Sequence, residues 1–246
     1  MIRAVLFDLD DTLYCESDFV RTGFGAVARA LDARGVGRAP ELSAMLESIH
    51  LGEGRERVFD KLAARLGFPP EWIPELIARY RAHRPDIALA ADAVQALARL
   101  RGRYRLGCVT DGWAAVQRRK LEALRLETRL DAIVVADDHG RRHWKPCPLP
   151  FFRCCTRLGV SPGECVYVGD DPERDVRGAR NAGMVSVRIR RAGGYFRHCT
   201  ADEDPSDFEL ASLTELESIL QDLNGPRDPA RPGGTVGRLD MPTRRS

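Results

Sequence analysis

From residue 91 to about residue 224, apolar runs of strand length alternate with amphipathic segments of helix length. The strand-type runs lie at 104–110, 132–136, 165–168, 185–189 and 208–210. The helix-type segments lie at 92–100, 114–124, 149–158, 173–182 and 213–223. Strands that alternate with helices are typical of a parallel sheet with helices on both faces. Together with an apolar strand that starts at residue 4, the pattern predicts a doubly wound, Rossmann-like α/β core.

Residues 17–83 show a different pattern, in which apolar residues recur at spacings of three and four. This periodicity predicts helices at 19–31, 41–50, 55–66 and 71–80, separated by Gly and Pro residues that break them. We therefore expect an all-helical insert in the α/β core. The predicted organisation is a core formed by residues 1–14 and 91–224, a helical cap domain at 15–90, and a disordered tail at 225–246.

The composition argues against several classes of function. The formal net charge of the 246-residue chain is only +2, which does not favour a nucleic-acid partner. Its apolar runs are all shorter than the roughly 20 residues that span a bilayer, so we expect no membrane partner. Seven cysteines without paired spacing, and an N-terminus unlike a secretion signal, predict reduced thiols and a cytoplasmic location. The sequence makes no prediction about the oligomeric state.

Two carboxylates, Asp8 and Asp10, stand at the end of the first apolar strand. Side chains two residues apart on a strand point the same way, so both acids project into the crevice beyond the carboxyl end of that strand. Two like charges at such a distance need a cation or a shared proton. A hard divalent ion removes the repulsion and leaves one oxygen of Asp8 free to attack an electrophile. The pair therefore indicates an enzyme.

Further polar residues follow other strands of the predicted sheet. Ligands of open α/β sheets bind beyond the carboxyl ends of the strands, so these positions are candidates for one site. Thr110 ends the second strand, and Asp170 and Asp175 follow the strand at 165–168. Lys145 lies in the loop that follows the strand at 132–136. A hydroxyl, a cation and acids therefore join Asp8 and Asp10 around one sheet.

Lysine is scarce in this chain, whereas arginine is abundant. The three lysines are Lys61, Lys120 and Lys145. Because this chain mostly uses arginine for its surface cations, each lysine is a candidate for a role that arginine does not fill. Lys145 is followed by a proline and precedes a predicted helix, which favours a functional role for its compact ammonium over a solvated surface position.

In this order, the residues resemble the motifs of the haloacid dehalogenase superfamily of phosphohydrolases, in the branch with a helical cap inserted after the first motif. The resemblance covers roughly residues 3–223. The second motif of the family more often ends in Asn-Gly, where Asp111-Gly112 stands here, but the backbone amide can still donate. The resemblance implies a Mg²⁺-dependent phosphatase that hydrolyses a small phosphorylated metabolite, a sugar phosphate in preference to a nucleotide, through an aspartyl-phosphate.

The resemblance also implies a role for each acid near the first strand. Asp8 attacks phosphorus and forms the aspartyl-phosphate. Asp10 is the general acid that protonates the leaving oxygen, and then the base that takes a proton from water. The metal ligands are Asp8, the backbone carbonyl of Asp10, and Asp170.

The remaining site residues support these steps. By the resemblance, Thr110 and Lys145 complete the electrostatic cradle for the phosphoryl group. Asp175 orients Lys145 or a metal-bound water from behind the metal site. The neighbouring acids Asp171 and Glu173 fall near a helix start, where a carboxylate is favourable without any metal, so we leave them out of the metal site.

Three alternative functions are compatible with the same fold. A sugar-phosphate mutase uses the same residues and differs in excluding water from the aspartyl-phosphate. A haloacid dehalogenase needs no acid for its leaving group, and the dehalogenases of this superfamily lack a carboxylate at the position of Asp10. A non-catalytic regulator binds a phosphorylated ligand without turnover, but every catalytic position is present here. The phosphatase is therefore the favoured interpretation.

Two polar segments outside these motifs carry weaker signals. His139 and His143 lack the fixed ligand spacing of a zinc site, so a polar loop at the cleft edge is favoured. Four arginines after the strand at 185–189 can attract an anionic substrate, but such groups are commonly solvated surface. These arginines are Arg188, Arg190, Arg191 and Arg197.

Overall fold

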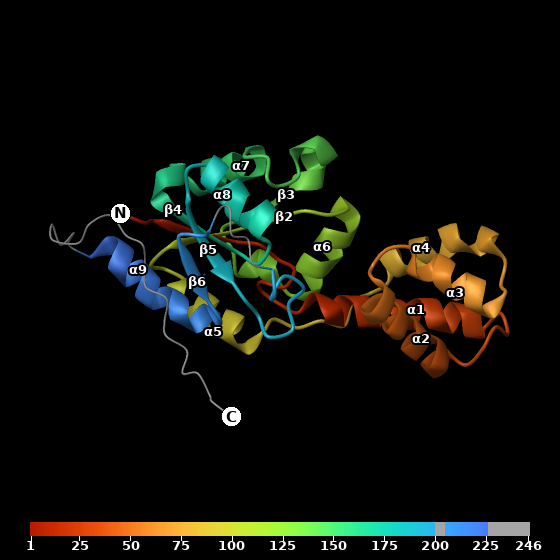
Figure 1. Ribbon diagram of the computed structural model, residues 1–246. Coiled ribbons are helices and arrows are strands. Elements are labelled where there is room, and N and C mark those ends of the chain that lie inside the picture. Colours follow the sequence, from red (N-terminus) through yellow and green to blue (C-terminus); the bar gives the residue numbers. More distant parts are fainter. Residues whose placement is uncertain (200–204, 226–246) are drawn as a thin grey trace, which may run out of the picture.

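The structure is a computed structural model that describes residues 1–199 and 205–225, and its centre is a parallel sheet (Figure 1). The strands are β1 (Ala4–Phe7), β2 (Arg105–Thr110), β3 (Ala132–Val135), β4 (Cys165–Gly169), β5 (Val185–Ile189) and β6 (Phe208–Leu210). Their order across the sheet is β3-β2-β1-β4-β5-β6, and each neighbouring pair is parallel. This is the order of a doubly wound fold, which confirms the Rossmann-like core predicted from the sequence.

Helices cover both faces of the sheet. They are α5 (Ala91–Leu100), α6 (Ala114–Ala123), α7 (Leu149–Leu158), α8 (Arg177–Asn181) and α9 (Leu216–Asn224). In β1, Val5 and Phe7 pack with apolar residues of α5, α6 and α9, whereas Ala4 and Leu6 pack with those of α7 and α8. Successive side chains of a strand point to opposite faces, so a strand buried on both faces is apolar throughout. This requirement explains the unbroken apolar run at the start of the chain.

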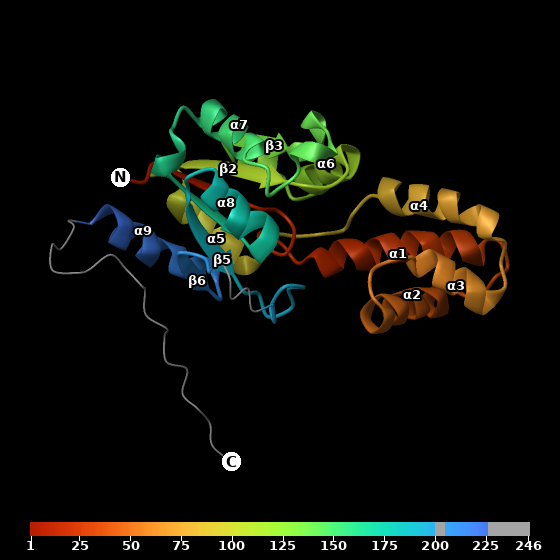
Figure 2. The same cartoon turned by 45° about the horizontal axis from the view of Figure 1, so that its top comes forward.

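Four helices stand beside the core, and both views show them on the same side of it (Figures 1 and 2). They are α1 (Glu16–Asp32), α2 (Ala39–Glu53), α3 (Val58–Leu66) and α4 (Ile73–Ala82), and we call them the helical module. The module has its own apolar cluster, which includes Phe24 and Leu46. Phe19 on α1 instead packs in the apolar cluster of the core, and Tyr80 on α4 contacts both clusters. The first turns of α1 and the end of α4 therefore join the module to the core.

Two predicted helices differ from those in the structure. The helix predicted at 55–66 begins only at Val58, because Arg57 has a left-handed backbone with φ of 55°. The segment predicted as a helix at 173–182 consists of a π-helical turn, η6 (Pro172–Val176), followed by α8. The Asp171 carboxylate caps this turn by accepting hydrogen bonds from the backbone N–H groups of Glu173 and Arg174. π-helical turns are rare and often occur at functional sites.

Short 3₁₀ turns complete the described segments. They are η1 (Pro70–Trp72), η2 (Leu126–Thr128), η3 (Ala136–His139), η4 (Arg141–His143), η5 (Pro162–Glu164) and η7 (Leu213–Glu215). Apart from Gly225, the predicted disordered tail at 225–246 lies outside the described residues. In the part of the chain that is described, no helix combines the length and apolarity needed to cross a membrane.

Candidate active site

The site residues predicted from the sequence gather at the carboxyl edge of the sheet. Asp8 follows β1, Thr110 ends β2, and Asp170 follows β4. Because the strands are parallel, these three positions meet at one edge. Lys145 comes from the loop between η4 and α7, and Asp175 comes from the turn η6. A cavity of about 430 Å³ is lined by Asp8, Asp10, Lys145, Asp170 and Asp175, among others. Thr110 is buried and is not one of the lining residues.

Lys145 holds Asp8 and Asp175 together. Its buried ammonium donates to Asp8 Oδ1 at 2.5 Å, to Asp175 Oδ1 at 2.6 Å, and to the Tyr167 hydroxyl at 3.2 Å. The three protons of the ammonium therefore all have acceptors. Asp175 Oδ2 accepts from the backbone N–H of Asp171 at 3.1 Å, which fixes the Asp175 side chain across the turn η6. Asp175 thus contacts Lys145 directly, and its predicted role in orienting that lysine stays a prediction.

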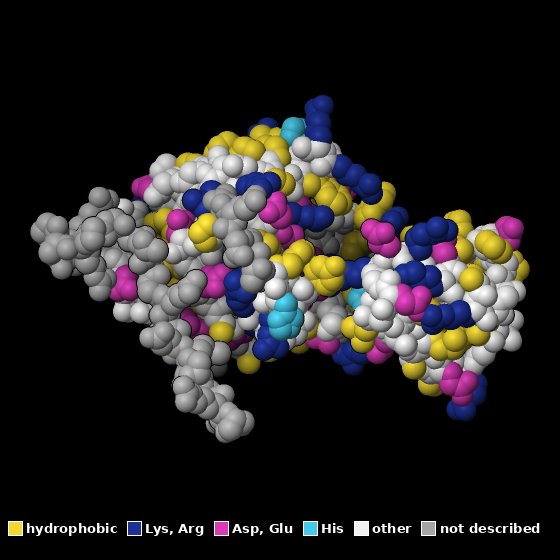
Figure 3. Space-filling model, in the orientation of Figure 1, with side chains coloured by type: hydrophobic (Ala, Val, Ile, Leu, Met, Phe, Trp, Pro, Cys, Tyr) yellow, Lys and Arg dark blue, Asp and Glu magenta, His cyan; other side chains and the backbone are white. Residues whose placement is uncertain are grey.

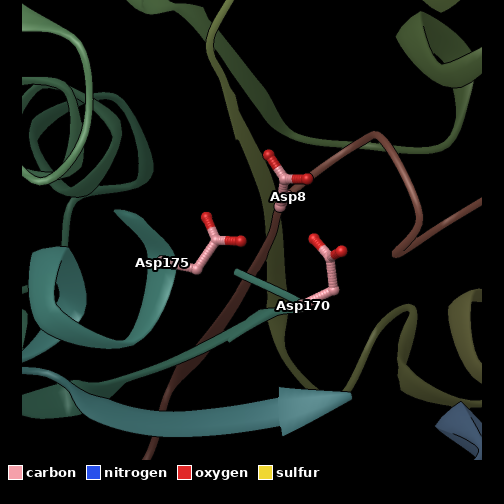
Figure 4. A group of neighbouring side chains, drawn as sticks. All are labelled: Asp8, Asp170 and Asp175. Atoms are coloured by element: carbon pink, nitrogen blue, oxygen red, sulfur yellow. The ribbon is translucent and has the colours of Figure 1, made fainter. Parts of the chain in front are cut away.

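Three carboxylates crowd this side of the site (Figure 4). One oxygen from each of Asp8, Asp170 and Asp175 lies within 4.8 Å of the others. Burial raises the pKa of Asp8 well above its usual range, although Lys145 opposes the shift. Burial and the charges of Asp175 and Asp8 raise the pKa of Asp170 to about 10. Lys145 alone does not balance these three acids, so the donor set fits a hard cation with oxygen ligands.

Asp10 has separate partners. Its Oδ1 accepts hydrogen bonds from the Lys120 ammonium at 2.7 Å and from the Tyr14 hydroxyl, and its Oδ2 accepts one from Gln117 Nε2 at 2.9 Å. Gln117 Nε2 also donates to Thr110 Oγ1 at 2.6 Å, which connects Thr110 to the site. Burial works to raise the pKa of Asp10, but Lys120 and the other donors outweigh it and lower that pKa. The contacts therefore favour the carboxylate form of Asp10.

Sequence reasoning did not assign Lys120, Gln117 or Tyr14 to the site. One usable signal was present, because Lys120 is one of only three lysines in an arginine-rich chain. A second signal is the spacing of three residues between Gln117 and Lys120, which places both side chains on the same face of α6. Both residues are buried, although they are polar. Buried polar side chains on a helix beside the carboxyl edge of the sheet indicate a functional role. Short sequence motifs do not reveal such a pair.

The two weaker sequence signals have structural explanations. Arg188 is buried, and it donates to the backbone carbonyls of Asp170 and Phe196 at 3.3 and 2.8 Å. Among the residues described, neither Arg188 nor the three nearby arginines line the cavity. The potential metal ligands that cluster in the described chain are Asp8, Asp170 and Asp175, and neither His139 nor His143 joins them.

The helical module forms the other wall of the cavity, and Figure 3 shows a hollow where the module meets the core. Glu16, Phe19, Arg55, Tyr80 and Arg81 line it from the module side. Two of these side chains contact aromatic rings of the core. The Arg55 guanidinium lies 3.8 Å from the centre of the Tyr195 ring, and that of Arg81 lies 4.3 Å from the centre of the Trp113 ring.

The fold and the site together define an enzyme of the Rossmann-like class, with a buried aspartate, a lysine and an acidic cluster at the carboxyl edge of its sheet. A family model described as haloacid dehalogenase-like hydrolase matches residues 2–183. The chain belongs to this family. It is an enzyme that hydrolyses phosphoric monoesters, as its relatives indicate.

Several characterised relatives extend over most of the chain. Glyceraldehyde 3-phosphate phosphatase of Methanopyrus kandleri is 36% identical over 234 residues, which cover 91% of this chain and 99% of that protein. N-acylneuraminate-9-phosphatase of Rattus norvegicus is 30% identical, with 91% and 95% covered. Phosphoglycolate phosphatase of Xylella fastidiosa is 32% identical, with 89% and 91% covered. All three names describe phosphatases of small metabolites.

Solved structures agree with the family assignment. The crystal structure of a haloacid dehalogenase-type phosphatase from Thermococcus onnurineus is 31% identical, with a TM-score of 0.60, and covers 89% of this chain and 98% of its own. A 2-haloacid dehalogenase from Pseudomonas syringae has a TM-score of 0.64 at 24% identity, covering 91% of this chain and all of its own. The second likeness concerns the fold alone.

Proposed function

We propose that the protein is a Mg²⁺-dependent phosphatase that hydrolyses a small phosphomonoester, a sugar phosphate in preference to a nucleotide, through an aspartyl-phosphate on Asp8. The observation that carries the proposal is the setting of Asp8. Its hydrogen bonds to side chains in the described chain involve Oδ1, which Lys145 holds, so Oδ2 is left for attack on phosphorus. Asp8 belongs to the acidic cluster with Asp170 and Asp175, whereas Asp10 is held separately by Lys120.

In the first step, an oxygen of Asp8 forms a bond to phosphorus while the bond from phosphorus to the leaving oxygen breaks. The leaving oxygen takes the proton of the Asp10 carboxylic acid and departs as an alcohol. Lys145 keeps the Asp8 carboxylate oriented during the attack and stabilises the phosphoryl oxygens. Thr110 contributes its hydroxyl to the same cradle from the end of β2.

In the second step, water attacks phosphorus and transfers a proton to the Asp10 carboxylate. The bond between phosphorus and the Asp8 oxygen breaks, so inorganic phosphate leaves and both aspartates return to their initial states. The resting contacts of Asp10 favour its carboxylate form. They therefore support its role as the base in the second step. The acid role in the first step requires Asp10 to hold a proton, which it keeps from the preceding turnover or takes from solvent.

The metal would be held by Asp8, Asp170 and the backbone carbonyl of Asp10. Mg²⁺ neutralises negative charge on the carboxylates and the transferring oxygens when it is bound. Carboxylate and carbonyl oxygens are the ligands that it prefers. Asp175 is engaged by Lys145, Tyr167 and the backbone of Asp171, which favours a supporting role for it behind the metal ligands.

The helical module is proposed to be a cap domain formed by residues 15–90, with the core at 1–14 and 91–224. A cap above the cavity admits small molecules and excludes folded proteins. The cavity of about 430 Å³ is of the size that takes a small ligand. Glyceraldehyde 3-phosphate and phosphoglycolate, named in two relatives, are substrates of this size class.

A cytoplasmic location is also part of the proposal. All seven cysteines are free thiols in the structure, including Cys155 and Cys165, whose sulfur atoms lie 3.6 Å apart. Free thiols at such a short distance are typical of a reducing compartment. The absence of a nucleic-acid partner belongs to the same proposal and rests on the low net charge. The absence of a membrane partner also belongs to it and rests on apolar runs shorter than the roughly 20 residues that span a bilayer.

The decisive experiment measures phosphate release from p-nitrophenyl phosphate and a panel of sugar phosphates and nucleotides in the presence of Mg²⁺. We expect the wild-type protein to be active and Asp8→Asn to fall to the assay background, because the amide is not a nucleophile. Asp18→Asn is a matched control, since Asp18 pairs with Arg21 at the surface and does not line the cavity. An inactive wild type across the panel, or an active Asp8→Asn, would falsify the proposal.

A further inference from the structure

Three side-chain donors hold the carboxylate of Asp10. Both oxygens are engaged, Oδ1 by Lys120 and Tyr14, and Oδ2 by Gln117. Tyr14 comes from the segment directly after β1, whereas Lys120 and Gln117 come from α6. Because the donors belong to two separate elements, the carboxylate is held from two sides.

Lys120 is costly to bury. Its side chain is only 4% exposed, so its ammonium has lost nearly all of its contact with water. The ion pair with Asp10 and the approach to the Phe19 ring, 4.4 Å from the ring centre, offset part of this cost. Buried ion pairs are nevertheless a poor source of stability, and apolar residues of similar size often serve as well or better. A lysine at this position therefore calls for a reason other than stability.

We propose that Lys120 is a positioning residue for Asp10, and that Gln117 assists it. The two α6 side chains hold the carboxylate at a fixed place, from which it exchanges a proton with the leaving oxygen and then with water. Gln117 also donates to Thr110 Oγ1, so the same side chain fixes the acid and the hydroxyl of the cradle relative to one another. This inference rests on the proposed phosphatase function, in which Asp10 is the acid and the base.

The positioning network extends into the helical module. Lys120 Nζ lies 3.9 Å from an oxygen of Glu16, the first residue of α1. The other oxygen of Glu16 accepts from Arg55, which stacks on Tyr195 of the core. The ammonium that holds Asp10 is therefore shared with the module wall of the cavity. Replacing Glu16 by Gln is expected to act in the same direction as replacing Lys120, but more weakly.

The test uses the dependence of the rate on the leaving group. Phenyl, p-nitrophenyl and 2,4-dinitrophenyl phosphate have similar shapes, but their leaving groups need protonation to decreasing extents. For Lys120→Met, we expect kcat/KM on phenyl phosphate to fall on the order of 10²-fold, within the range that general acid catalysis contributes. On 2,4-dinitrophenyl phosphate we expect a loss of less than about threefold, because this leaving group departs without an acid.

The controls separate positioning from a structural effect. Lys120→Arg keeps a cation and is expected to recover part of the loss on phenyl phosphate. Lys61→Met is the matched lysine control, because Lys61 donates to the backbone carbonyl of Glu53 on the module surface. We expect this variant to have the wild-type kcat/KM on all three substrates. Gln117→Leu keeps the ion pair between Lys120 and Asp10, so it provides the same test if Lys120→Met does not fold, as judged by circular dichroism.

Equal losses on all three substrates in both Lys120→Met and Gln117→Leu would overturn the inference, as would no loss in either variant. A wild-type protein inactive on the whole series with Mg²⁺ would overturn the proposed function and the inference together. An active wild type whose Lys120 variants lose activity evenly would leave the function in place and remove only the positioning role. A larger loss of kcat/KM on phenyl phosphate than on 2,4-dinitrophenyl phosphate in these variants supports the positioning role.

Discussion

Asp8 and Asp10 are two residues apart, and each contacts a buried lysine, yet their surroundings differ. Lys145 serves two carboxylates, Asp8 and Asp175, with Asp170 close by. Lys120 bonds Asp10 directly, and the other donors to Asp10 are neutral. The pKa of Asp8 is raised, chiefly by burial, whereas the pKa of Asp10 is lowered by its donors despite burial. Environment, and not residue type, therefore shifts the pKa values of the two acids in opposite directions, which supports the different tasks proposed for them.

The difference also shows which region depends on a bound ion. The surroundings of Asp8 hold more carboxylates than their single lysine balances, so this region fits a further cation. The carboxylate of Asp10 already has a donor at each oxygen. In the proposed mechanism, the carboxylate of Asp8 would therefore be held by metal and protein together, and the carboxylate of Asp10 by protein side chains alone.

The largest expected effect comes from Lys145→Met. This substitution leaves Asp8 and Asp175 buried without their cation. We therefore expect the activity to fall to background and the free energy of unfolding to decrease by about 3–5 kcal/mol. Urea denaturation without Mg²⁺ measures the second quantity. Lys120→Met should cost less, because Asp10 is 23% exposed and only one carboxylate is left unpaired. Equal destabilisation by the two substitutions would contradict the comparison.

A moderate effect is expected from the metal. A ligand that binds only the folded state adds about 2.7 kcal/mol at 100 times its dissociation constant, which for a chain of this size raises the melting temperature by roughly 5–10 °C. We expect saturating Mg²⁺ to do so in the wild type and EDTA to reverse it. Asp170→Asn should abolish the increase in melting temperature. Asp10→Asn should retain it, because the ligand proposed at residue 10 is the backbone carbonyl and not the side chain. Thermal melts with and without Mg²⁺ decide between these outcomes.

The smallest effect concerns Asp92, an acid of the core outside the site. Burial opposes its charge, but the backbone N–H of Leu213 and the Arg191 guanidinium outweigh burial and lower the pKa of Asp92. A folded-state pKa below the unfolded value of about 3.9 stabilises the protein at neutral pH, and this contribution disappears as the pH falls through the folded-state pKa. Asp92→Asn should cost about 1 kcal/mol at pH 7 and less in acid. Denaturation at both pH values checks this trend, which a cost independent of pH would contradict.

Much of the core could be predicted from the sequence because strand and helix periods are local. The strand positions and the residues at their carboxyl ends follow from apolar runs, and the parallel edge then brings Asp8, Thr110 and Asp170 together. The π-helical turn at Pro172–Val176 could not be predicted in this way. It depends on the Asp171 cap and on the bond from the Asp171 backbone to Asp175, which are specific contacts without a periodic signal.

The surroundings of Asp10 were less predictable for a related reason. Lys120 is 110 residues from Asp10 in the chain, and on a helical wheel it is one polar residue among several of α6. Only the packing of α6 against the core buries it and turns it towards the acid. Motifs identify residues that touch the substrate in many proteins, whereas residues that hold those groups in place are visible only in three dimensions.

The stacking of Arg55 on Tyr195 and of Arg81 on Trp113 has a consequence for the speed of the catalytic cycle. Such contacts contribute about 0.5–1 kcal/mol each at exposed sites. Breaking these two contacts therefore costs about 1–2 kcal/mol in total. This free energy corresponds to a factor of roughly 5 to 30 in the equilibrium between the joined and the separated module. If the module is the proposed cap, contacts this weak would let it part from the core and would not slow the release of product.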